Sequence, residues 1–219
     1  MMKDRLEEMN RHISALSHII KDIEERMKAS DVSFLKVTIK LSPVILDPNT
    51  ASPQLILSDD LTSLTFNKSR QPFPDNAERF DFFRCVLGSE GFKSGTHSWD
   101  VEVGNNSAWT VGVITASYQR KGDNFFKAGV WYVQYTGKEY VSQSPEQPAT
   151  RFSVKEKLRR MRVQLDWDNG TVSFSDLVTN TQLRTFRTVL RETFFPFLQS
   201  ICESSPLRIL PVKIQISSI

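Results

Sequence analysis

Apolar residues in the first 30 positions recur at alternating steps of three and four. They are Leu6, Met9, Ile13, Leu16, Ile20, Ile23 and Met27. This spacing is the a/d pattern of a heptad repeat, sustained for about three heptads, with charged residues on the other faces. We therefore predict a coiled-coil helix over 1–30 that joins two copies of the chain. An amphipathic helix docked on the following domain is the alternative, although its apolar stripe is usually wider.

After a connector over 31–43, the hydrophobic pattern changes to period two. Short runs alternate apolar and polar residues between clusters of turn-forming residues, which is typical of β-strands. The predicted strands are 55–57, 63–66, 99–103, 109–113, 130–135, 161–167, 171–174 and 207–210. Many short strands with almost no helical periodicity predict an all-β fold, an antiparallel two-sheet β-sandwich over 44–219.

The run Asp168-Asn169-Gly170 between two predicted strands indicates a β-hairpin. Asn and Gly both tolerate positive φ, so we expect a tight turn with positive φ at both residues.

Composition supports a folded core and offers little catalytic chemistry. Hydrophobic residues make up 39% of the chain and the formal charge is +3. Cys85 and Cys202 lie far apart without metal-ligand spacing, so we expect reduced thiols, no zinc and no other cofactor. No signal peptide or membrane span is evident, and we expect a cytoplasmic protein.

Two features could carry catalysis, and both have a structural explanation. Only His97 lies in the predicted sandwich, within a strand-forming run, and we expect it to be packed or hydrogen-bonded. Asp166 and Asp168 flank Trp167 and resemble a carboxylate pair, but a hairpin mouth favours turn capping. We therefore expect no enzymatic activity from this chain.

Basic residues occur in two sets that leave RNA binding open as a minor alternative. The residues are Lys155, Lys157, Arg159, Arg160 and Arg162, and then Arg184, Arg187 and Arg191. A solvated loop is the favoured explanation of the first set, since Glu156 interrupts it and the run merges into a predicted strand.

Strand alternation selects candidate contact residues in the run 130–135. If Trp131 enters the core, Tyr132, Gln134 and Thr136 face outward. Phe125 and Phe126, in the preceding loop, would be anchors for a partner if they are exposed.

A series of motifs in chain order resembles one known family. They are Leu46-Asp47-Pro48-Asn49-Thr50-Ala51, Arg79-Phe80-Asp81, Val86-Leu87-Gly88-Ser89-Glu90-Gly91-Phe92, Trp99-Asp100-Val101-Glu102-Val103, Gly129-Val130-Trp131, Leu165-Asp166-Trp167 and Phe195-Pro196-Phe197. Over about residues 44–215 the sequence is similar to PRY-SPRY domains, which implies a concanavalin-like jelly roll. It departs from the usual family residues at Ser52, Thr96 and Ser98.

The helical segment adds to this resemblance. The runs 19–24 and 28–35 look like the end of the coiled coil in tripartite-motif (TRIM) proteins, especially those of fish. The implied parent is a ubiquitin ligase with RING and B-box domains. The chain has too few Cys and His residues for either, so we expect the C-terminal part of such a protein, or a truncated relative.

The resemblance implies recognition of a protein target, with a role in innate immunity among the expectations. The matching surface positions are Thr110, Gln134 and Thr136, together with the loop around Ser200-Ile201-Cys202. A carbohydrate-binding sandwich is a further alternative because lectins share the two-sheet architecture.

Overall fold

A computed structural model describes residues 44–123 and 129–211. The predicted coiled coil over 1–30 and the connector over 31–43 lie outside the described residues. Within the described part, the chain forms two antiparallel β-sheets, as the period-two pattern predicts. None of the described segments is a helix long and apolar enough to cross a bilayer.

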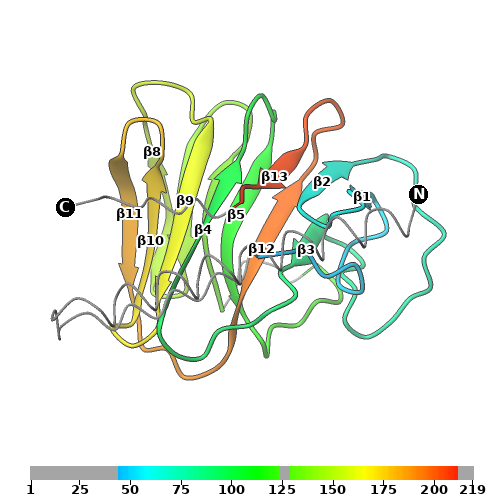
Figure 1. Cartoon of the computed structure of the whole chain (residues 1–219), viewed down its shortest axis with the longest axis horizontal. Helices are drawn as coiled ribbons and strands as arrows, with labels where there is room; N and C mark the ends of the chain where they lie inside the picture. The colour runs from blue at the N-terminus through cyan, green and yellow to red at the C-terminus, as the bar shows by residue number, and fades with distance from the viewer. Residues whose placement is uncertain (1–43, 124–128, 212–219) are drawn as a thin grey trace, which may run out of the picture. The chain divides into compact units, whose positions relative to one another are not determined.

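The first sheet has seven described strands in the order β1-β2-β13-β4-β9-β10-β11. Their bounds are Leu55–Leu57 (β1), Ser63–Phe66 (β2), Leu207–Ile209 (β13), Thr96–Glu102 (β4), Arg160–Asp166 (β9), Thr171–Asp176 (β10) and Thr181–Arg187 (β11). Figure 1 shows the strands of this sheet side by side, with β11 and β1 toward opposite ends.

The second sheet has six described strands in the order β3-β12-β5-β6-β7-β8. Their bounds are Cys85–Leu87 (β3), Phe194–Ser200 (β12), Trp109–Thr115 (β5), Val130–Tyr135 (β6), Tyr140–Ser144 (β7) and Gln147–Phe152 (β8). The chain passes from β4 to β5 through the turn at Gly104 and Asn105, and so changes sheet there.

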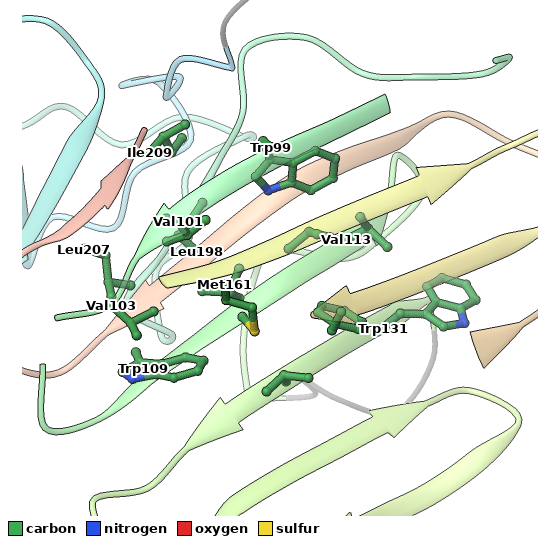
Figure 2. Packing of buried hydrophobic residues seen from close by; sticks show 14 of the residues in the cluster. Trp99, Val101, Val103, Trp109, Val113, Trp131, Met161, Leu198, Leu207 and Ile209 are labelled. Atoms are coloured by element: carbon green, nitrogen blue, oxygen red, sulfur yellow. The ribbon is translucent and has the colours of Figure 1, made fainter. Parts of the chain in front are cut away.

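The main core lies between the two sheets. Inward side chains of both layers are almost completely buried, as alternation along each strand requires. Figure 2 shows Trp109 of β5, Met161 of β9 and Leu207 of β13 among the buried residues of this core. Trp131 enters this core, as predicted, and its ring centroid lies 5.0 Å from that of Phe194.

A second, smaller core covers part of the outer face of the six-stranded sheet. Phe80 and Phe83, from the segment before β3, pack there against Tyr132 and Phe197. Gly112 lies directly opposite Tyr132 and Phe197 in the ladder, where an added Cβ would meet Tyr132 Cα at 2.9 Å. The Trp131 carbonyl oxygen would clash with that Cβ and a Phe197 ring carbon would lie 3.0 Å from it, so glycine permits the close approach of the β6 backbone and of the Phe197 ring.

The hairpin between β9 and β10 forms where it was predicted, but its turn differs. Gly170 has a φ of +62°, whereas Asn169 does not have positive φ. The connection runs from Trp167 to Gly170 and is longer than a two-residue turn. It therefore does not require positive φ at two successive residues, as a two-residue type I′ turn would. Instead, Asp166 accepts a hydrogen bond from the Asn169 backbone at 3.0 Å.

Candidate functional site

A row of three polar side chains crosses the outer face of the six-stranded sheet. The ladder places Gln199 of β12 opposite Thr110 of β5, and Thr110 opposite Gln134 of β6. Their neighbours along each strand face the opposite way, since Trp109, Val133 and Leu198 belong to the main core. Three strands distant in sequence thus bring their polar residues together.

Hydrogen bonds join the row into one chain. Gln134 Nε2 donates to Thr110 Oγ1 at 3.2 Å, and the Thr110 hydroxyl donates to Gln199 Oε1 at 2.9 Å. Thr110 is only 1% exposed, so its hydroxyl lies beneath the two half-buried glutamines. The glutamines are therefore the polar groups that a partner would reach first.

These residues line a shallow depression of about 130 Å³. The lining residues are Ala108, Trp109, Thr110, Gln134, Tyr135, Thr136, Gln199 and Ile201. The depression brings together the predicted positions Thr110, Gln134 and Thr136, and the exposed Ile201 lies at it. The part of the outer face near Tyr132 is covered, so this depression occupies its uncovered part.

The expectation that Tyr132 is an exposed contact residue is wrong. Its side chain does point away from the main core, but it is only 3% exposed. It is part of the second core with Phe80 and Phe197, and its hydroxyl donates to Gln143 Oε1 at 2.8 Å. Burial also raises the pKa of Tyr132 to about 12.

Ser200 and Cys202, predicted as contacts, are buried too. Ser200 Oγ accepts a hydrogen bond from Asn106 Nδ2 at 2.9 Å and another from the Cys202 backbone at 3.1 Å. These bonds fix the loop, so that Ile201 between them is 54% exposed. The loop therefore offers Ile201 to a partner, while Ser200 and Cys202 hold it in place.

The Cys202 thiol has an unusual environment. Burial acts to raise its pKa, but hydrogen bonding with Ser107 and Ser204 outweighs that effect and lowers the pKa to about 6. Cys85, by contrast, lies in the second core, where burial raises its pKa. Both thiols are free.

One further candidate residue, Gln199, was not singled out from the sequence. Gln199 becomes a candidate only because β12 pairs with β5, and this pairing joins residues far apart in the chain. Ile201 stands in the predicted loop, but its burial could not be distinguished from that of its neighbours. The predicted anchors Phe125 and Phe126 lie outside the described residues.

His97 and the two aspartates have structural partners. The His97 ring stacks on Phe92 with centroids 3.9 Å apart, and its Nε2 lies 2.8 Å from the Ser94 carbonyl oxygen. Asp168 Oδ1 accepts a hydrogen bond from the Gly95 backbone at 3.1 Å. Asp166 bonds both the backbone and the side chain of Asn169, which lower its pKa. The expected packed histidine and turn-capping carboxylates are confirmed.

The basic residues of β9 pair with acidic residues of β4. Arg162 forms a bidentate pair with Asp100 at 2.7 and 2.8 Å, which raises the arginine pKa. Arg160 lies 3.4 Å from Glu102. These carboxylates offset two of the five positive charges of the first basic set.

Arg184, in the second basic set, is also engaged. Its guanidinium lies 4.1 Å from the centroid of the Phe152 ring, and its Nε donates to Ser142 Oγ at 2.9 Å. It lines a groove of about 480 Å³ that also includes Lys155, Glu156 and Asp176. The mixed charges of this groove favour neither an anion nor a cation.

Comparison with known proteins identifies the domain. The SPRY-associated domain called PRY matches residues 44–92, and the SPRY domain matches 96–204. Mouse butyrophilin subfamily 2 member A2 is 37% identical over 85% of this chain and 36% of its own length. The mouse E3 ubiquitin-protein ligase TRIM69 is 39% identical over 72% of this chain and 31% of its own. The chain thus spans about a third of these two curated relatives.

Solved structures agree on the fold. The crystal structure of the TRIM65 PSpry domain superposes with a TM-score of 0.69, at 19% identity, over 83% of this chain and 98% of that one. At this identity the likeness concerns the fold alone. With both family models matched in order across the described sheets, the chain belongs to the PRY-SPRY domain family of TRIM-type and butyrophilin-type proteins.

Proposed function

We propose that this chain is the target-recognition part of a TRIM-type ubiquitin ligase and binds a protein through the open part of its six-stranded sheet. The observation that carries the proposal is the depression at Gln134, Thr136 and Ile201, which joins polar strand residues to an exposed apolar loop residue. Protein interfaces commonly combine an apolar contact residue with hydrogen-bonding groups beside it.

The remaining part of the proposal concerns the parent protein. The ligase role rests on the similarity to TRIM69 and on the resemblance of the N-terminal segment to a TRIM coiled coil. Residues 1–30 would pair two chains and so present two recognition surfaces, which strengthens binding to a repetitive target. The proposal also includes a cytoplasmic localisation of the protein and a role in innate immunity.

Proximity labelling in cells of the species of origin tests the recognition surface. The full chain and its Ile201→Asp variant are compared, because a charge at this apolar position opposes docking. Val178→Asp is the matched control, since Val178 is 62% exposed and follows β10 in the other sheet. We expect Ile201→Asp to lose a set of labelled proteins that Val178→Asp retains. Equal labelling by all three proteins would refute the proposed surface.

A further inference from the structure

We infer that the depression selects partners that insert an asparagine or glutamine side chain between Gln134 and Gln199. This inference rests on the proposed function and names the chemistry of the group that the surface recognises. It starts from the hydrogen-bond chain of Gln134, Thr110 and Gln199.

The Thr110 hydroxyl makes the two glutamines unlike each other. A hydroxyl has one proton to donate, so Thr110 donates to one amide and accepts from the other. With Gln134 Nε2 donating to Thr110, the Gln134 carbonyl oxygen and the Gln199 amino group remain without partners among the described residues. If the side-chain oxygen and nitrogen of both glutamines are interchanged, Gln134 offers the free amino group and Gln199 offers the free carbonyl oxygen. In either direction, one acceptor and one donor stand on either side of Thr110.

A carboxamide matches this pair because it carries its donor and its acceptor on separate atoms, whereas a hydroxyl offers both from a single oxygen. Its amino group donates to the free carbonyl oxygen, and its own oxygen accepts from the free amino group. A carboxylate can only accept and an ammonium can only donate, so each leaves one glutamine unpaired.

Charge and size support the same choice. None of the residues that line the depression carries a formal charge, so an ionised partner group would lose its hydration without an opposite charge to compensate. The volume of about 130 Å³ is slightly below the roughly 150 Å³ of a cavity that admits benzene. It therefore accommodates one side chain, and Ala108 and Ile201 provide apolar contact for its methylene groups.

A random peptide library displayed on phage tests this inference with the full chain as bait. Peptides that bind the wild type and lose binding to Ile201→Asp are sequenced. We expect them to share an Asn or Gln at one position. Changing that residue to Asp or Leu should raise the dissociation constant of the peptide about tenfold or more. The reason is that a glutamine group, desolvated by the bound peptide, then loses its hydrogen-bond partner.

Matched substitutions in the chain complete the test. Gln134→Met and Gln199→Met keep the length of the side chain and remove its hydrogen bonds, and each should weaken the same peptides about as much. Gln164→Met is the control, since Gln164 is exposed on β9 in the other sheet. Ile201-dependent peptides with an acidic, basic or apolar anchor would overturn this inference and leave the proposed function standing. A library without any Ile201-dependent binder would overturn both.

Discussion

Replacing Tyr132 with alanine should strongly destabilise the domain, although Tyr132 points away from the main core. A buried aromatic side chain removes on the order of 150–250 Å² from water. At about 25 cal/mol per Å², and allowing for residual burial in the unfolded chain, this area contributes about 3–5 kcal/mol. Since Tyr132 is 3% exposed, nearly all of that contribution applies. Measured costs of removing large core aromatics fall in the same range, about 3–5 kcal/mol.

Urea denaturation followed by tryptophan fluorescence measures the change in the free energy of unfolding. Tyr132→Phe isolates the hydroxyl and its bond to Gln143, and should cost about 1 kcal/mol. Gln134→Ala, two positions along the same face, should stay within about 0.5 kcal/mol of the wild type. A Tyr132→Ala protein within about 0.5 kcal/mol of the wild type would contradict the second core and return Tyr132 to the surface.

Further predictions concern pH, assembly, nucleic acid and activity. Burial holds the folded-state pKa of Tyr132 near 12, above its ordinary value, so its contribution to the free energy of unfolding is full below about pH 10 and falls as pH rises toward 12. Between pH 9 and pH 11, urea titrations should show a smaller loss of unfolding free energy for Tyr132→Phe than for the wild type. Replacing Ile13, Leu16 and Ile20 with Asp should reduce the mass measured by light scattering, whereas an unchanged mass favours the docked helix. RNA titrations at two salt concentrations should detect no tight binding, since Asp100 and Glu102 neutralise two arginines of β9. The chain supplied with activating and conjugating enzymes should not ubiquitinate itself, and measurable product would refute its assignment as a binding part.

The sequence predicts strands well where alternation is strong. The strands predicted at 55–57 and 63–66 are confirmed, as is the burial of Trp131. Five of the described strands were not predicted, namely β3, β7, β8, β11 and β12. The clearest case is β8, over Gln147–Phe152, because it is an exposed edge strand of largely polar residues and contains Pro148. Such an edge lacks the apolar face on which period-two analysis depends.

The candidate site was harder to predict, for a different physical reason. Alternation tells which side of a sheet a residue occupies, but not whether another segment covers that side. Tyr132 and Gln134 share the outer face, yet Phe80 and Phe83 cover the first and leave the second half-exposed. The row from Gln199 to Gln134 depends on the order of β12, β5 and β6, which joins residues far apart in sequence.

The way the strands are shared between the two matched regions bears on how such domains can be divided. β3 of the PRY region hydrogen-bonds to β12 of the SPRY region, and β13, which follows both matched regions, lies between β2 and β4. A fragment starting at residue 96 would expose the edge of β12 and the rings of Tyr132 and Phe197. In this chain the PRY and SPRY regions therefore share both sheets, and we expect a fragment that lacks residues 44–92 to be prone to aggregation.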